Sequence, residues 1–226
     1  MTGPGGIELV LRSDHDRLDL AAFCGRLARL DPGSLVRLTA VGDRLTGYAR
    51  LPWQVLVSRT VHRVPAAGVD VTVVDVTVAV ADMLAATGTP APLRLGPGAV
   101  RDGEWRGTLP PTAGWRRIEV VPVPAIDGAV RAAVATYDGA RGRPDADVVA
   151  ATVLDHAALT ASDGQVSVVL PMGALYAAQR MAFLGPDPSG SAVACAVSRS
   201  GPWARLAAPY GSVYHRQDPG PVLRPG

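Results

Sequence analysis

Hydrophobic and polar residues alternate along the chain at two different spacings, which predict a mixture of helices and strands. Five apolar residues between positions 20 and 30 recur every three or four residues, and Pro32-Gly33 follows them. This spacing predicts an amphipathic helix that ends before the Pro-Gly pair. Residues 35–39 and 45–51 alternate with a period of two around a Gly-Asp turn, and 54–64 continues that character. These segments predict a three-stranded antiparallel meander.

The same two spacings predict the remaining elements. Further strands are expected at 7–11, 69–74, 118–121, 165–170, 192–197, 202–207 and 212–216. Further helices are expected at 75–86, 124–137 and 172–184. Residues 148–159 fit either a helix or a strand, and Pro144 followed by Asp145 and Asp147 favours the helix.

Part of this pattern occurs twice. Arg26, Ala28 and Leu30 match Arg180, Ala182 and Leu184 at an offset of 154, and residues 48–51 match 203–206 at an offset of 155 with Tyr in place of Trp. A chain rich in Ala, Leu, Val and Arg also produces such matches by chance, so the repeat stays open. The fold class predicted is α+β, with two related modules, each a small, mostly antiparallel sheet packed by one or two helices.

The domain boundaries follow from composition. Residues 87–100 contain three Pro and three Gly without any hydrophobic period, which is typical of a linker. We therefore expect an N-terminal module at 1–87, a linker at 88–101, a C-terminal module at 102–216 and a flexible tail at 217–226. With 48% hydrophobic residues the chain can build a core, and wholesale disorder is excluded.

The net charge and the distribution of charged residues do not indicate a particular class of binding partner. The 22 basic residues are all Arg, and the net charge is +2. The replacement of Lys extends through the whole chain, which favours codon bias over a selection for phosphate-binding guanidinium groups. Neither half carries the dense basic field on which phosphate binding usually rests. Cys24 and Cys195 lie in apolar surroundings and are expected to be buried thiols, although a disulfide between them stays open.

The chain is expected to be a soluble, cytoplasmic protein without a membrane partner. Its first residues lack the basic start of a signal peptide, and Asp70, Asp75 and Asp82 interrupt the longest β-branched stretch.

Clusters of residues that could carry catalysis or bind a metal are scarce in the sequence. Asp14-His15-Asp16 and Asp155-His156 are the acid and histidine clusters, and both fit helix capping or a surface position better than a metal site. We predict no metal, no cofactor and no catalytic residue, and the enzyme question leans toward no.

A resemblance to known proteins rests on the second half. The motifs LPPTAGW, FLG, WARL and YGSVYHR resemble a group of uncharacterised proteins from high-GC actinobacteria, mainly over residues 105–216. This resemblance implies a two-part chain and no particular chemistry.

Three functions remain in competition. We favour a non-catalytic binding or assembly protein that self-associates as a homo-oligomer, because apolar residues are abundant and reactive groups are few. The alternative is a DNA-binding protein with a winged-helix-like second half, in which nucleic acid is a partner. A hydrolase with dispersed catalytic residues is a second alternative, since scattered groups leave no local motif. If the second half contacts a ligand or nucleic acid, the expected side chains are Arg180, Trp203, Arg205 and Arg216.

Overall fold

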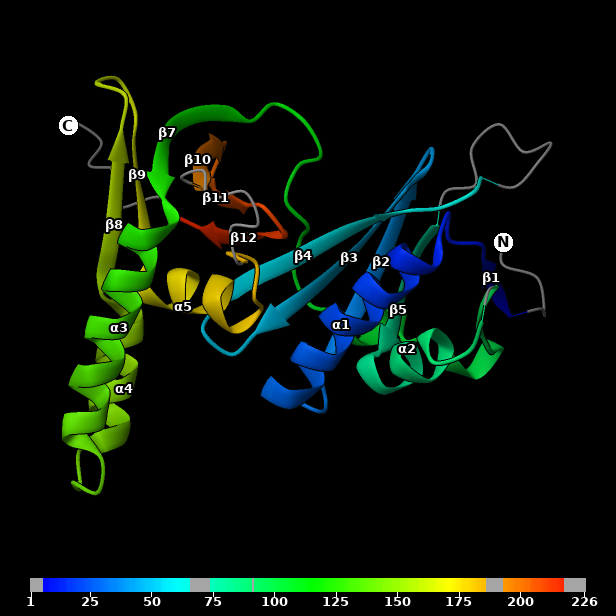
Figure 1. Cartoon of the computed structure of the whole chain (residues 1–226), viewed down its shortest axis with the longest axis horizontal. Coiled ribbons are helices and arrows are strands. Elements are labelled where there is room, and N and C mark those ends of the chain that lie inside the picture. The colour runs from blue at the N-terminus through cyan, green and yellow to red at the C-terminus, as the bar shows by residue number, and fades with distance from the viewer. Residues whose placement is uncertain (1–5, 66–73, 91, 186–192, 218–226) are drawn as a thin grey trace, which may run out of the picture. The chain divides into compact units, whose positions relative to one another are not determined.

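A computed structural model describes residues 6–65, 74–90, 92–185 and 193–217 (Figure 1), and the chain divides into two compact units. The first comprises Met1–Leu51 with Leu56–Thr108, and the second comprises Pro52–Val55 with Leu109–Gly226. Each unit combines antiparallel strands with helices, so the α+β class with two modules is confirmed. The predicted strand residues 69–73 and the tail from 218 onward lie outside the described residues.

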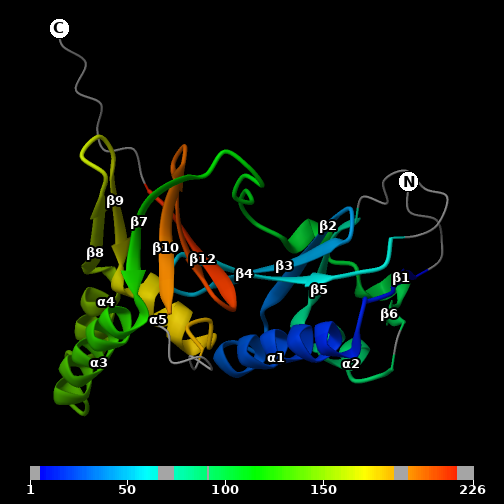
Figure 2. The same cartoon turned by 45° about the horizontal axis from the view of Figure 1, so that its top comes forward.

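The first unit contains four strands in the order β5-β2-β3-β4. Their bounds are β2 (Leu35–Val41), β3 (Arg44–Leu51), β4 (Val55–His62) and β5 (Val74–Ala79). Figure 2 shows α1 (Asp14–Leu30) and α2 (Val80–Thr87), which contact each other, lying along one side of these strands. A smaller antiparallel pair joins β1 (Ile7–Leu9) to β6 (Leu93–Leu95). The short 3-10 turns η1 (Pro97–Ala99) and η2 (Asp102–Glu104) follow β6.

Helix α1 forms where its sequence supplies a cap and an apolar face. The Ser13 hydroxyl accepts a hydrogen bond from the Asp16 backbone N–H, which satisfies one of the donors exposed at the helix start. Leu20, Phe23 and Leu27 are at most 1% exposed. Gly47 in β3 faces this helix, and a Cβ added there would lie 3.5 Å from the Phe23 ring. The helix therefore packs closely on the sheet through a large residue opposite a small one.

The second unit contains four antiparallel strands in the order β12-β11-β10-β7. Their bounds are β7 (Arg116–Pro122), β10 (Ala194–Ser200), β11 (Trp203–Ala208) and β12 (Gly211–Arg216). A separate hairpin joins β8 (Ala157–Ser162) to β9 (Ser167–Pro171). The helices are α3 (Val123–Ala140), α4 (Ala146–Asp155) and α5 (Met172–Arg180). Figure 1 shows α3 and α4 side by side as a helical hairpin.

The internal matches in the sequence fall only in part on equivalent elements: Arg26, Ala28 and Leu30 lie in α1, whereas Ala182 and Leu184 lie beyond the end of α5. In the first unit one helix is followed by three strands, α1-β2-β3-β4, and in the second the order is α5-β10-β11-β12. Residues 48–51 lie in β3 and residues 203–206 in β11, so each segment belongs to the middle strand of its three. These two segments therefore occupy corresponding places, as a pseudo-repeat requires.

Several predicted elements differ from the structure. Asp75–Ala79, predicted as the start of a helix, belongs to β5, because its alternating Val residues fit a strand and α2 begins only at Val80. Residues 148–159 are divided between α4 and β8, so both interpretations hold in part. Residues 88–101, expected as a linker, contain β6 and η1 and belong to the first unit. The strands predicted at 192–197, 202–207 and 212–216 are confirmed.

The winged-helix arrangement is not found in the described part of the second unit. A wing is a hairpin beside an exposed recognition helix, whereas β10, β11 and β12 are members of a four-stranded sheet with β7. Helix α5, the expected recognition helix, is mostly buried. Its apolar character makes it a core element of the unit.

Candidate functional site

Three of the four predicted site residues lie on one face of the second unit's sheet. Trp203 pairs with Arg216, and Arg205 pairs with Tyr214, across the antiparallel strands β11 and β12. Residues two apart in a strand share a face, and paired residues face the same side. Trp203, Arg205, Tyr214 and Arg216 therefore form one group. Arg180 does not join it, because it ends α5 and its guanidinium lies 5.9 Å from the ring centre of Tyr176.

Trp115 completes this group, although the predicted set of site residues omits it. The Arg205 guanidinium lies over the Trp115 ring at 4.4 Å, and the Trp115 and Tyr214 rings are 5.7 Å apart. Trp115 donates its indole N–H to the carbonyl of Pro111 at 2.9 Å. The LPPTAGW segment thus returns an aromatic ring to a surface, as its proline pair predicts. We call Trp115, Trp203, Arg205, Tyr214 and Arg216 the arginine–tryptophan face.

The arginine–tryptophan face has the chemistry of a surface for anions and flat rings. The Nε of Arg205 is buried without a hydrogen-bond partner among the described residues, so the stacked ring is the main neighbour of that guanidinium. Arg216 is exposed and forms no ion pair among the described residues. Arg117 lies in the same row, opposite Ser198, which also pairs with Arg205. Guanidinium groups bind phosphate oxygens in pairs, and exposed tryptophan can stack on a base.

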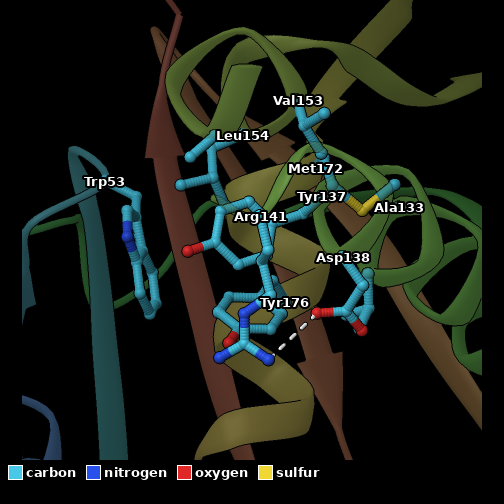
Figure 3. Close-up of a pocket in the computed structure, with 11 residues that line it drawn as sticks. Trp53, Ala133, Tyr137, Asp138, Arg141, Val153, Leu154, Met172 and Tyr176 are labelled. Atoms are coloured by element: carbon cyan, nitrogen blue, oxygen red, sulfur yellow. Dashed lines mark ion pairs between the residues drawn. The ribbon is translucent and has the colours of Figure 1, made fainter. Parts of the chain in front are cut away.

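A hollow of about 400 Å³ lies among the three helices of the second unit (Figure 3). Apolar and aromatic side chains form most of it, and two charged residues lie at one side. We call it the α3–α5 pocket, and its lining includes Trp53, Tyr137, Asp138, Arg141, Leu154 and Tyr176. A cavity of this size and composition is typical of small-molecule sites.

Trp53 is held at the pocket by an unusual local backbone. The next residue, Gln54, adopts a left-handed conformation with φ of 57°, which is uncommon outside glycine. The Trp53 ring meets the Tyr176 ring edge-on at 5.1 Å. Gly173 of α5 allows this approach, since a Cβ there would lie 3.1 Å from the Trp53 Cβ. The aromatic wall therefore depends on one strained turn and one glycine.

The charged side of the pocket consists of Asp138 and Arg141 near the end of α3. Their closest atoms, Asp138 Oδ1 and Arg141 Nη1, are 3.6 Å apart, and the side chains are 52% and 70% exposed. The Arg141 guanidinium also lies 6.0 Å from the Tyr137 ring centre. This ion pair is long and solvent-exposed, so most N–H donors of the Arg141 guanidinium remain available to another anion.

The two acid and histidine clusters are explained by local structure. Asp14 pairs with Arg17, and Asp16 accepts hydrogen bonds from Ser13 Oγ and from the His62 backbone N–H. Partial burial raises the pKa of the Asp16 carboxyl. These hydrogen bonds lower the pKa by more than burial raises it, so the net pKa lies below the usual value. His156 is the exposed C-cap of α4. Across the described ranges, no three Asp, Glu, His or Cys side chains come together as a metal site would require.

The two cysteines are buried and unlinked. Burial raises the pKa of the Cys24 thiol to about 12, and burial together with the Asp127 carboxylate raises the pKa of Cys195 to about 11. Such thiols are protonated at neutral pH and are poor nucleophiles. Among the described helices, none is long and apolar enough to span a bilayer.

Sequence reasoning missed the α3–α5 pocket. Its residues come from the turn at Trp53 and from three helices, and no local sequence motif predicts how those helices pack. The predicted helix 124–137 contains Tyr137, but Asp138 and Arg141 follow its predicted end, so no local signal joined these charged residues to the aromatic ones.

Comparison with known families divides the chain in two. Residues 6–107 match the family described as "Domain of unknown function (DUF8010)", and residues 110–220 match "Domain of unknown function (DUF8185)". Both descriptions agree with the resemblance to proteins of unknown function, whereas an actinobacterial origin remains an expectation. A search of curated proteins finds no match.

Comparison with solved structures identifies the fold. The Caulobacter crescentus DNA polymerase III beta structure is 14% identical, with 96% of this chain and 65% of that chain covered and a TM-score of 0.52. The Thermotoga maritima DNA polymerase III beta subunit is 12% identical, with 93% and 64% covered and a TM-score of 0.51. The Helicobacter pylori beta clamp is 11% identical, with 96% and 65% covered and a TM-score of 0.52. The chain thus has the fold of DNA polymerase sliding clamps and spans slightly less than two thirds of their length.

Proposed function

We propose that this protein is a non-catalytic, self-associating protein that associates with DNA. The observation that carries the proposal is the similarity of fold to DNA polymerase sliding clamps over 96% of the chain. Fold similarity alone transfers no activity, so the proposal also needs surfaces that suit DNA and a second copy. We expect the protein to act in the cytoplasm, where chromosomal DNA of a bacterium lies.

The arginine–tryptophan face is the surface we assign to DNA. Strands β7, β10, β11 and β12 together carry five arginines and one glutamate. The five helices α1–α5 carry five arginines against eight aspartates, so they offer no positive field to a phosphate backbone. Positive charge and the half-buried rings of Trp115 and Trp203 coincide on the sheet of the second unit, which favours Trp203, Arg205 and Arg216 as contacts.

The α3–α4 hairpin is the surface we assign to self-association. Helix α4 is rich in Val and Ala but buries none of its residues, and Val148 is 68% exposed. Val134 and Tyr137 of α3 add exposed apolar area. Exposed apolar residues that gather on one hairpin mark an interaction site more often than isolated ones do.

DNA retention as a function of salt tests the proposed DNA contact. The unmodified protein should bind duplex DNA at low salt, and log K should fall linearly with log salt concentration. Arg216→Ala should weaken binding and reduce that slope by about one unit for each phosphate that the protein no longer neutralises. Arg143→Ala is the matched control, because Arg143 is also exposed in the same unit but pairs with Asp145. Absence of retention at low salt, or equal effects of the two variants, would contradict the proposal.

Light scattering tests self-association separately. The chain should have an average mass above that of a monomer at micromolar concentration, and the mass should fall on dilution. A clean monomer mass across the concentration range would remove this part of the proposal and leave the DNA contact to its own test.

A further inference from the structure

The α3–α5 pocket has features of a small-molecule site, which the proposed function does not include, although Val134 and Tyr137 belong both to its lining and to the proposed self-association surface. Its floor and walls combine the side chains of Trp53, Tyr137, Leu154, Met172 and Tyr176. The three aromatic rings enclose a space of about 400 Å³, which is large enough for a ligand of one or two fused rings. Figure 3 shows Arg141 and Asp138 on the same side of the pocket residues, with Trp53 standing apart on the other side.

The charges at the opening favour a negative ligand. Arg141 is the basic residue of the pocket lining, and Arg180, outside that lining, lies 5.9 Å from the ring centre of Tyr176. Arg180 is exposed and forms no ion pair among the described residues. Asp138 is the acid that lines the pocket, and it holds Arg141 only at 3.6 Å. Because Asp138 holds Arg141 weakly, most donors of that guanidinium remain available beside an apolar floor, and Arg180 adds a positive charge near the Tyr176 wall.

The pocket walls are fixed before any ligand arrives. Trp53 is positioned by the left-handed backbone of Gln54 and by its close approach to Gly173. Backbone strain persists only where the surrounding structure holds it, and it gathers at functional positions. A preformed aromatic wall spares a ligand the entropy of ordering those side chains.

We propose that the α3–α5 pocket binds a small organic anion with a flat apolar body, such as an aromatic carboxylate or sulfonate. The ring system occupies the space between Trp53, Tyr137 and Tyr176, and the anionic group accepts hydrogen bonds from Arg141. Arg180 adds positive charge at the rim. This site is independent of the DNA contact, which lies on the sheet.

A pair of fluorescent probes tests the charge preference directly. Anilinonaphthalene sulfonate and N-phenylnaphthylamine share an aromatic body, but only the first is anionic. Titration of the folded full-length chain should give tighter binding of the sulfonate by about threefold to tenfold, because the charge contact is partly exposed. Excitation of tryptophan should transfer energy to the bound sulfonate, and Trp53→Phe should reduce that transfer.

Three variants locate the effect at the two charged residues. Arg141→Gln should weaken the sulfonate by about threefold to tenfold and leave the neutral probe unchanged. Asp138→Asn should strengthen the sulfonate, because it removes the competing carboxylate; an unchanged urea midpoint is required as well, since partial unfolding also increases binding of this dye. Arg131→Gln, on α3 and outside the pocket lining, should change neither probe.

Equal affinities for the two probes in the unmodified chain would overturn the proposal. So would an Asp138→Asn variant that binds the sulfonate no better, or an Arg131→Gln variant that matches Arg141→Gln. Because these titrations contain no DNA, their failure leaves the proposed function untouched, and success does not depend on it.

Discussion

Replacing Gly173 with alanine tests how the aromatic wall of the pocket is built. Alanine is ordinarily the better helix residue by about 0.8–1 kcal/mol, so the substitution would stabilise a helix with open space beside it. In α5 the new Cβ would lie 3.1 Å from the Trp53 Cβ and 3.4 Å from the Leu154 carbonyl oxygen. Overpacking of this kind costs about 1–3 kcal/mol, which exceeds the gain from helix propensity. Gly173→Ala should therefore lower the free energy of unfolding by up to about 2 kcal/mol.

Gly128→Ala in α3 supplies the control. A Cβ there would meet only the end of the Arg131 side chain, at 3.9 Å, so the propensity gain should appear almost undiminished. We expect a stabilisation of about 0.5–1 kcal/mol. Urea denaturation of both variants gives the comparison, and anilinonaphthalene sulfonate binding should weaken only in Gly173→Ala. If Gly173→Ala is as stabilising as Gly128→Ala and leaves probe binding intact, the assigned role of Gly173 is wrong.

Individual contacts support four further predictions. Because burial keeps Cys24 and Cys195 protonated, neither thiol of the folded chain should react with a disulfide reagent at pH 8, and both should react in denaturant; rapid reaction of the folded chain would contradict their burial. The lowered pKa of Asp16 stabilises the folded chain at pH values above the usual pKa of 3.8, and this stability is lost as pH falls through the folded pKa. In urea denaturation, Asp16→Asn should therefore be less stable than the unmodified chain at neutral pH and equally stable well below pH 3.8. Gly211→Ala should cost about 1–3 kcal/mol by the same measurement, because a Cβ would lie between 2.5 and 2.6 Å from ring atoms of the buried Phe183. Val148→Glu should reduce the average mass in light scattering without reducing stability, whereas an unchanged mass would exclude α4 from the self-association surface.

Elements with a strong local signal could be predicted from the sequence. The apolar positions 20–30 with a following Pro-Gly predicted α1, and the alternation around Gly42-Asp43 predicted the β2–β3 hairpin, where Gly42 has φ of 58°. The strands that close the second unit were found for the same reason. These elements carry their hydrophobic period and turn residues within a short stretch of chain.

Elements whose type depends on packing could not be predicted. Val74–Ala79 carries Val at every second position, but Val76 also falls on a helical stripe with Val80 and Met83, and pairing with β2 determines that the segment is a strand. The division of 148–159 between α4 and β8 is similar, because β8 is set by its pairing with β9. Long-range partners decide such segments, and no local propensity reports them.

The candidate sites likewise divide into those with a local sequence signal and those formed only by the fold. Trp203, Arg205 and Arg216 were found because they are close in sequence and alternate along neighbouring strands. Arg180 was expected to join them as a residue of the recognition helix in a winged-helix arrangement, yet it lies beside the Tyr176 ring on α5. The α3–α5 pocket joins residues that are far apart in the chain, from Trp53 to Tyr176, and only the fold brings them together.

Retention on closed circular DNA compared with linear DNA tests the central proposal most directly. If the proposed self-association encloses the proposed DNA partner, the protein leaves through free ends, whereas an ordinary groove-binding protein dissociates equally from both forms. After assembly at low salt and a shift to higher salt, the unmodified chain should remain on circular duplex DNA and should dissociate when a restriction enzyme linearises the circle. Equal dissociation from circular and linear DNA of the same sequence would contradict a clamp-like function for this fold.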